Sequence, residues 1–492
     1  MNRITVIYVL ILTIVTAAIF AVIHAGADLP APAPINGPAG VVTPAAAAAH
    51  PAAAVAISQS AGEAMVANLK ENFKHPLSQL FLQLVVIIAI SRTVGKLFTF
   101  MGQPSVVGEM AAGILLGPSL FGLLTPDLFQ FVFPANSLNT IKLLSQVGVC
   151  LFMFSVGMDL NISHVRNKAH TAVVVSHASI VFPYLLGVVL AYFLYTSMAA
   201  PGASFIAFAL FMGISMSITA FPVLARILQE RGMTKSFLGS TAITCAAVDD
   251  VTAWSILAFV VAIARSTSLG GSALNLLLIG AFMLVMVAIV RPGLPKWLGE
   301  KRLKAENPSK GVMATVICVV VASALCTEVI GIHALFGAFL AGAIMPDLHG
   351  FRHKLHVRIE NFSSVLLLPL FFVFTGLRTQ IALLHDLSGW GMCLIIIAVA
   401  SLGKLGGTAL TARLTGMGWR DSLQLGALMN TRGLMELIAL NIGYDLGILS
   451  PRIFTMLVIM ALATTALTGP LLTWFGAQKS PEPEGQPHPA QS

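Results

Sequence analysis

Two adjacent aspartates, Asp249 and Asp250, lie in the segment CAAVDDVTAW, residues 245–254, which is otherwise apolar. An ionisable side chain at the middle of a membrane helix costs about 2.5–3.5 kcal/mol on insertion scales, so such residues are functional candidates. Neighbouring helical residues point about 100° apart, so one carboxylate can line a cavity while the other faces a partner helix. Because close carboxylates repel each other, one of them can exchange a proton near neutral pH and bind a hard cation when deprotonated. The pair predicts a shared site for protons and for Na⁺ or K⁺. The alternative is two structural acids that bond to helix ends or hydroxyl groups.

Other ionisable residues also interrupt apolar segments. Lys404, in SLGKLGGTAL, is too far from either end of its segment to reach water easily, so a buried carboxylate is its expected partner. Asp249 is the first choice, and a salt bridge without a role in transport is the alternative. Arg432 and Glu436 are four residues apart and can pair on one helix face, which favours a structural ion pair over substrate contact. Glu109 is close enough to a helix end to be structural.

Helix-breaking residues occur inside two apolar segments, one in each half of the chain. Pro222 lies in GISMSITAFPVLARI, and Asn430, Thr431 and Gly433 lie in GALMNTRGLMELIAL. Proline removes a backbone donor and frees a carbonyl, and unwound backbone at membrane depth persists only where it is buried or lines a cavity. Two interrupted helices in corresponding positions are typical of a transporter's central site. Two packing kinks are the simpler alternative.

Composition and hydropathy define the fold class. The chain has 492 residues, of which 57% are hydrophobic and only 10% charged, whereas soluble domains average about 25% charged residues. Apolar stretches near the ~20 residues that cross a bilayer follow one another, which predicts an all-α polytopic membrane protein with about 13 transmembrane helices. These stretches cover residues 77–97, 103–123, 138–159, 170–197, 204–229, 236–264, 274–291, 311–330, 332–348, 361–380, 386–414, 422–446 and 451–476.

Loop charges give the orientation and exclude other classes. Basic loops, such as the one with Arg226 and Arg231, alternate with loops that hold few positive charges, such as TPDLFQFVFPANS. The positive-inside rule then places the C-terminus in the cytoplasm. The net charge of +8 is spread over these loops rather than gathered in a patch, so no nucleic-acid binding is expected. The five cysteines lie inside apolar runs without metal-ligand spacing; neither a structural metal nor a cofactor is expected.

Four segments are predicted along the chain. Residues 1–27 form a signal peptide, with AGA at 25–27 as a cleavage site, or an uncleaved signal anchor. Residues 28–75 form an Ala/Pro-rich periplasmic linker, 76–476 the transmembrane domain, and 477–492 a disordered cytoplasmic tail. The periplasmic-like linker favours a Gram-negative inner membrane.

Seven motifs in order resemble those of the monovalent cation:proton antiporter-2 family, and the chain is similar to plant cation/proton exchangers over roughly residues 76–476. The motifs are QPSVVGEMAAGILLGPS, LFMFSVGMDL, SITAFPVLARIL, AAVDDVTAW, GIHALFGAFLAGAIMPD, LPLFFVFTGL and MNTRGLMELI. The resemblance implies the sodium/proton antiporter fold, with inverted repeats, two broken helices that cross beside the acids, and a homodimer. By the family pattern Asp250 is the essential carboxylate for cation and proton, Asp249 its neighbour, and Lys404 a salt-bridge partner of the first acid, while Thr219 helps to line the site.

The function expected from the sequence is secondary transport, in which a monovalent cation and protons compete at the Asp249–Asp250 pair, and not enzymatic catalysis. The acids are adjacent on one segment, whereas an intramembrane aspartyl protease places its two acids on different helices. Proton-coupled transport of an organic solute on the same fold is the main alternative, and a cation channel a weaker one. The choice between Na⁺ and K⁺, and between one and two protons per cation, stays open.

Overall fold

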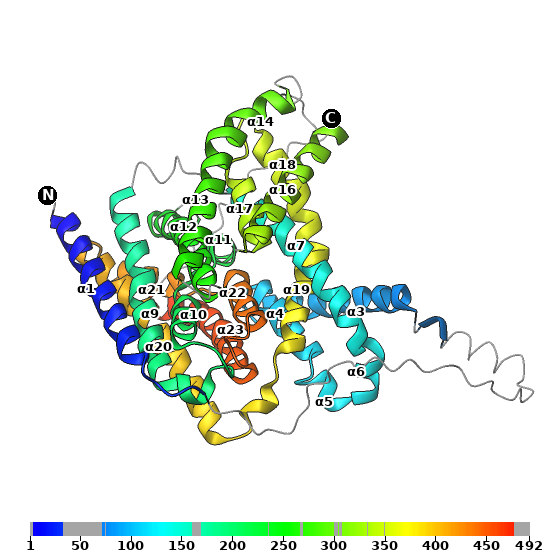
Figure 1. Ribbon diagram of the computed structural model, residues 1–492, viewed down its shortest axis with the longest axis horizontal. Helices are drawn as coiled ribbons and strands as arrows, with labels where there is room; N and C mark the ends of the chain where they lie inside the picture. Colours follow the sequence, from blue (N-terminus) through cyan, green and yellow to red (C-terminus); the bar gives the residue numbers. More distant parts are fainter. Residues whose placement is uncertain are drawn as a thin grey trace, which may run out of the picture.

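A computed structural model describes most of the chain. The described residues are 3–32, 71–73, 75–159, 169–234, 236–265, 269–299, 304, 308–331, 333–348 and 350–476. Most of the predicted linker, from 33 to 70, and the predicted tail, 477–492, lie outside them. The described part is built from helices (Figure 1), which confirms the predicted all-α class.

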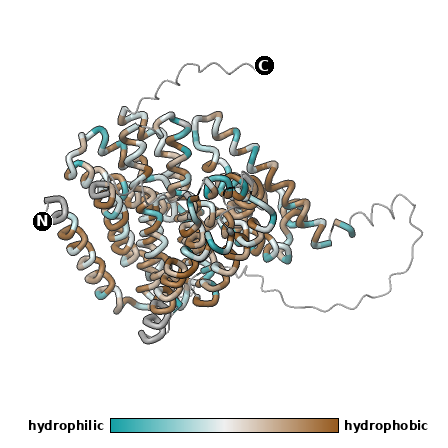
Figure 2. Tube along the Cα trace, turned by 90° about the horizontal axis from the view of Figure 1, so that it is seen from above, coloured by the Kyte–Doolittle hydropathy of each residue, from teal (hydrophilic) through white to brown (hydrophobic). Residues whose placement is uncertain are grey.

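Twelve helical segments of the described part are long and apolar enough to span a membrane, and one of them lies near the N-terminus. Figure 2 shows apolar residues along most of the helix lengths. The longer helices outside the two interrupted segments are α1 (Arg3–Gly26), α3 (Pro76–Phe100), α4 (Ser105–Leu116), α7 (Leu138–Asp159), α9 (Ala169–Met198), α12 (Phe237–Arg265), α13 (Leu269–Val285), α16 (Lys310–Ile330), α18 (Phe351–Phe362), α19 (Leu368–Arg378), α20 (Leu387–Leu414) and α23 (Pro451–Trp474).

Each of the thirteen predicted apolar stretches coincides with helix. Eleven of them are among the candidate membrane spans. The other two are the stretch 332–348, where α17 (Ala334–Ala343) has only 10 residues, and the interrupted segment within 422–446. Short helices complete the described chain: α5 (Phe121–Leu124), α6 (Pro126–Val132), η1 (Ala135–Ser137), α14 (Arg291–Leu298) and η4 (Ile381–Leu384), with π-helical turns at η2 (Met286–Val290) and η3 (Ser363–Leu367).

Two membrane segments are broken at their middle, as the sequence predicts. The first consists of α10 (Phe205–Ser217) and α11 (Phe221–Glu230), and the second of α21 (Trp419–Met429) and α22 (Leu434–Asp445). Pro222 lies in the first turn of α11, where its missing N–H has no intrahelical partner to lose. Gly433 has φ 166° and ψ −134°, and it is the residue just before α22.

The broken helices pack among the unbroken helices α9, α12, α20 and α23. We call these four helices, together with α10, α11, α21 and α22, the crossing bundle. Within it the helix order repeats: an unbroken helix, a broken pair and a second unbroken helix occur as α9 to α12 and again as α20 to α23. This repeat places a chain interruption from each half of the sequence at the bundle centre.

A second group of helices, α3, α4, α7 and α16 to α19, packs beside the crossing bundle and is called the flanking bundle (Figure 1). Its helices approach closely through glycines. A Cβ added at Gly376 of α19 would lie 2.0 Å from the carbonyl carbon of Gly113 on α4, so only glycine fits there. Small residues at helix contacts are typical of membrane bundles, because packing rather than the hydrophobic effect holds these helices together.

The N-terminal helix α1 packs against α9 and α10 of the crossing bundle (Figure 1). Val15 is buried, and Gly26 lies so close to Phe205 that an added Cβ would be 1.9 Å from its ring. The signal peptide or signal anchor expected for residues 1–27 stays a prediction, as do the segment boundaries proposed from the sequence.

Candidate functional site

The two aspartates lie at the middle of α12, inside the crossing bundle. Asp249 and Asp250 are each fully buried, with 0% of their surface exposed. As neighbours on one helix they point in different directions, and their surroundings differ accordingly.

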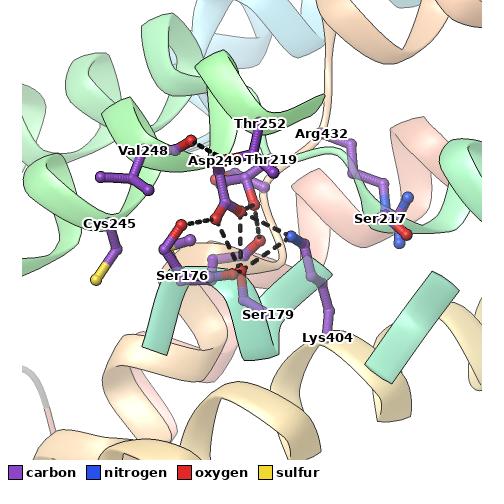
Figure 3. Close-up of polar contacts among 12 residues, drawn as sticks. Ser176, Ser179, Ser217, Thr219, Cys245, Val248, Asp249, Thr252, Lys404 and Arg432 are labelled. Carbon is purple, nitrogen blue, oxygen red and sulfur yellow. Dashed lines mark hydrogen bonds and ion pairs between the residues drawn. The ribbon is translucent and has the colours of Figure 1, made fainter. Parts of the chain in front are cut away.

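Asp249 is surrounded by donors from three other segments (Figure 3). Its Oδ2 accepts from Lys404 Nζ of α20 at 3.0 Å and from Thr219 Oγ1 at 2.7 Å. Ser179 Oγ of α9 lies 2.8 Å from the same oxygen, and Ser176 Oγ donates to Oδ1. These four side chains satisfy the carboxylate with hydrogen bonds from three segments of the fold. Its charge is also balanced by Lys404, which is itself fully buried.

Asp250 has a different environment. Among the described residues, neither of its carboxylate oxygens has a hydrogen-bond partner with acceptable geometry, although both are buried. The backbone N–H of Phe221, at the start of α11, points to this carboxylate. A helix N-terminus carries partial positive charge and favours an anion. Asp250 is therefore a buried carboxylate near a helix end, with its oxygens not committed to other side chains.

The two interruptions cross directly beside the acids. The backbone N–H of Ala220 donates to the carbonyl of Thr431 at 3.0 Å, which joins the two unwound segments. Thr219 Oγ1 lies 3.0 Å from the carbonyl of Met429 as well as close to Asp249, so this hydroxyl links the acid to the second broken helix. Thr431 turns its own hydroxyl to the carbonyl of Leu428.

Arg432 neutralises the end of α10. Its guanidinium donates to the carbonyls of Ser215 at 2.6 Å and Met216 at 2.7 Å. These carbonyls belong to the last turn of α10, where helix geometry leaves them without backbone partners, and a cation there also suits the helix dipole. Nη1 of Arg432 lies 3.3 Å from Oε2 of Glu436, in the first turn of α22, and both residues are fully buried. The pair thus connects two half-helix ends and does not contact the aspartates.

Asn430 ends α21 and is fully buried, and neither of its side-chain polar atoms has a hydrogen-bond partner among the described residues. Glu109 lies apart from this group on α4, where its Oε1 is 3.6 Å from Arg92 Nη1. Of the residues singled out in the sequence, the structure brings Asp249, Asp250, Thr219 and Lys404 together and leaves Glu109 in the flanking bundle.

A cavity of about 470 Å³ runs between α12 of the crossing bundle and α17 of the flanking bundle. Ala247 and Trp254 line it, and they are three residues before and four residues after Asp250 on α12. Val248, Val251, Thr252 and Ser255 of α12 line it too, so the cavity follows the stretch of α12 that contains Asp250, although Asp250 is not among its lining residues. Arg291, at the start of α14, also lines the cavity.

Ion pairs join the crossing bundle to the flanking bundle at the end of α22, away from the cavity. Asp445, the last residue of α22, accepts from Arg378 Nη2 of α19 at 2.6 Å and lies 3.2 Å from Lys142 Nζ of α7. Arg378 also donates to Oδ1 of Asn441 at 2.9 Å. These contacts hold the end of a crossing-bundle helix against two flanking-bundle helices.

Ser176 and Ser179 were not identified in the sequence as site residues. They lie in the apolar run VVVSHASIVF, three positions apart and therefore on one helix face. Hydroxyls at that spacing within a span were the available signal. Serine is common in membrane helices, however, where it can bond to the preceding turn, and only the structure shows that these two serines face Asp249.

Comparisons with known proteins agree with this arrangement. A family model described as sodium/hydrogen exchanger, transmembrane, matches residues 84–478. The chain is 44% identical over 390 residues to the Na⁺/H⁺ antiporter NhaS4 of Synechocystis sp., covering 79% of this chain and 95% of that protein. It is 40% identical over 415 residues to cation/H⁺ antiporter 20 of Arabidopsis thaliana, covering 81% of this chain and 48% of the relative. The K⁺/H⁺ antiporter 1 of Saccharomyces cerevisiae is 31% identical over 407 residues, which are 81% of this chain and 46% of that protein.

The chain therefore spans about half the length of these plant and yeast relatives. Among solved structures, that of the sodium proton antiporter MjNhaP1 from Methanocaldococcus jannaschii superposes with a TM-score of 0.58, covering 81% of this chain and 98% of that one. At 15% identity, this likeness shows the fold.

Proposed function

Because this chain belongs to the sodium/hydrogen exchanger family, we propose that it exchanges Na⁺ or K⁺ for protons across a membrane, with cation and proton competing for Asp250. Membership confirms the family resemblance carried by the seven motifs. The observation that carries the assignment to Asp250 is its buried carboxylate, whose oxygens are not held by other side chains of the described chain.

The division of roles between the acids follows from their contacts. The sequence predicts both as cation ligands, but Asp249 is engaged by Lys404 and by three hydroxyl groups. Asp250 is the carboxylate whose oxygens remain available. A hard monovalent cation favours oxygen ligands such as carboxylates and backbone carbonyls, and unwound backbone of both broken helices lies beside the acids.

Competition at one carboxylate gives coupled exchange. With a proton or a monovalent cation bound, Asp250 is neutralised and the site can move past a low-dielectric barrier at little electrostatic cost. With neither bound, the uncompensated charge opposes that movement. Movement of the crossing bundle relative to the flanking bundle exposes the site to alternate sides. The cavity between α12 and α17 and the ion pairs around Asp445 are consistent with one state of this cycle, open on one side and closed on the other.

Orientation, assembly and location are part of the same proposal. Basic residues such as Arg226, Arg291 and Arg413 lie at one set of helix ends, which supports a cytoplasmic location for that side, for the cavity and for the C-terminus. The protein is proposed to be a homodimer of a Gram-negative inner membrane that exchanges ions without catalysing a chemical reaction. The family resemblance supports the dimer.

The test is dissipation of a pH gradient in everted membrane vesicles after addition of NaCl or KCl. We expect one or both salts to discharge the gradient with the wild-type protein, and the Asp250→Asn variant to be inactive because its amide cannot bind a proton or neutralise a cation. Asp386→Asn is the matched control, since it removes an exposed carboxylate paired with Arg452 and distant in sequence from the acids. An Asp250→Asn variant as active as the wild type contradicts the site assignment. A folded wild type that ignores both salts contradicts cation exchange and favours an organic solute.

A further inference from the structure

We propose that the cavity between α12 and α17 binds an anionic phospholipid, with an acyl chain in the apolar part of the cavity and the phosphate group at Arg291. The inference goes beyond the proposed exchange of ions and does not depend on it. The occupant is a lipid of the surrounding bilayer, such as phosphatidylglycerol, and not a transported solute.

The cavity suits a hydrocarbon chain. Its volume of about 470 Å³ is within the range of about 300–1,000 Å³ that is typical of ligand sites. Most of its lining side chains are aliphatic or aromatic, and they come mainly from α12, from α17 and from the continuous helix formed by α13, η2 and α14. The hydroxyl groups of Thr252 and Ser255 also line it, but each donates to a backbone carbonyl of α12, at 2.9 Å and 2.8 Å. Neither hydroxyl therefore requires a polar ligand.

The cavity reaches the outer surface of the helices. Val251 of α12, Met283 of α13 and Val287 of η2 line it, and they are 46%, 38% and 46% exposed. Exposed apolar side chains at membrane depth contact lipid tails, which are as apolar as leucine. A chain from the bilayer can therefore enter between α12 and α13 without passing through water.

Arg291 is the charged residue of the lining. Met283, Val287 and Arg291 follow one another at intervals of four, so they form an apolar stripe that ends in a guanidinium group. Eight residues of helix span about 12 Å, which separates the chain contact from the head-group contact. Arg291 is exposed, and its guanidinium makes no hydrogen bond or ion pair within the described part of the chain. Such a group can bind phosphate through two parallel N–H donors.

The charge of the head group decides which lipid is preferred. An acyl chain gains little when it leaves other chains for an apolar cavity, because both surroundings are equally apolar. Basic pockets between membrane helices on the cytoplasmic side bind anionic head groups, and the proposed orientation places Arg291 on that side. We expect a preference of about fivefold for an anionic over a zwitterionic phospholipid, which corresponds to about 1 kcal/mol for one basic residue.

A lipid bound in this cavity contacts both bundles. Trp254 of α12 and Phe339 of α17 both line the cavity, and their ring centroids are 5.8 Å apart. The lipid must leave before these helices can close the cavity, so its occupancy favours the conformation in which the cavity is open.

The experiment measures quenching of Trp254 fluorescence by phospholipids with brominated acyl chains. Trp254 is only 3% exposed, so lipid outside the cavity does not reach its ring. The other four tryptophans, Trp297, Trp390, Trp419 and Trp474, are replaced by phenylalanine. The protein is reconstituted in phosphatidylcholine vesicles that contain increasing fractions of brominated phosphatidylglycerol or brominated phosphatidylcholine. We expect half-maximal quenching at an about fivefold lower fraction of the brominated phosphatidylglycerol.

Arg291→Gln should abolish this difference, and Arg291→Lys, which keeps the positive charge, should retain it. Lys296→Gln is the matched control, because it neutralises an exposed cation of α14 that does not line the cavity. A protein that keeps only Trp390, which is 41% exposed on α20, should be quenched equally by both lipids. If Arg291→Gln does not fold, a rise in salt concentration carries the test, since screening should reduce the preference of the wild-type site.

Three results overturn the inference. If neither lipid quenches Trp254, no chain enters the cavity. Equal quenching by the two lipids means that the site does not recognise head-group charge. A preference that survives Arg291→Gln means that another group binds the phosphate. Because fluorescence is measured without transport, a wild type that lacks cation-driven proton flux overturns the proposed function alone.

Discussion

The ion pairs of Asp445 offer a direct test of how the two bundles are held together. Asp445→Asn keeps the size of the side chain and removes its charge, so it weakens the contacts with Arg378 at 2.6 Å and Lys142 at 3.2 Å. The side chains of Asp445 and Lys142 are each 31% exposed and that of Arg378 is 15% exposed. Ion pairs of this exposure contribute about 0.2–1 kcal/mol each after solvent screening.

Together the two pairs stabilise the closed arrangement by about 1–2 kcal/mol, with the less exposed Arg378 pair at the upper end of its range. Since 1.4 kcal/mol is a factor of ten in an equilibrium constant, opening at this end should become about 5- to 30-fold more favourable in the variant. Ser145 lines a small pocket beside Asp445 and Asn441. It is a suitable position for a cysteine whose alkylation reports that opening.

The assay compares the rate at which a membrane-impermeant maleimide modifies Ser145→Cys with and without Asp445→Asn, after the five native cysteines are replaced. The rate should rise by about the same 5- to 30-fold. Asp386→Asn is the control, because the pair Asp386–Arg452 at 2.8 Å lies within the crossing bundle, between the start of α20 and α23. Equal alkylation rates in all three proteins refute the idea that Asp445 holds the bundles together at this end.

Two further predictions concern competition and packing. Because a proton and a cation compete for Asp250, each pH unit of acidification should raise the apparent KM for the cation about tenfold wherever Asp250 is mostly protonated. Initial rates of exchange between pH 6 and 9 measure this dependence. A KM that is independent of pH argues against a shared carboxylate. Gly376→Ala should lower the unfolding temperature of the purified protein, because the added Cβ meets the backbone of Gly113 at 2.0 Å and overpacking typically costs about 1–3 kcal/mol. Gly391→Ala on α20, whose added Cβ meets no atom within 4 Å, should not lower it, and equal losses in both variants contradict the packing argument.

The amino-acid sequence by itself determines the membrane architecture of this protein. Every backbone polar group in a bilayer must be satisfied within its own helix, so an apolar run of about 20 residues forms a spanning helix whatever its neighbours are. The positions of the helices can therefore be read from local hydropathy. The predicted stretches accordingly coincide with helices, and the breaks just before Pro222 and around Asn430 occur where the residue types indicate them. The high cost of burying charge also makes Asp249, Asp250, Lys404 and Arg432 visible as unusual residues without any structure.

Only the tertiary structure decides what each of these residues contacts. Asp249 and Asp250 are identical in type and adjacent in sequence, and the helix rotation of about 100° between them directs one toward α9 and α20 and the other toward the start of α11. Arg432 pairs with Glu436 as its spacing predicts, but its main contacts are carbonyls more than 200 positions away in the chain. Ser176 and Ser179 have no unusual feature in the sequence, because serine in an apolar helix can satisfy its hydroxyl locally. Their contact with Asp249 depends on how α9 packs against α12, which is a long-range property of the fold.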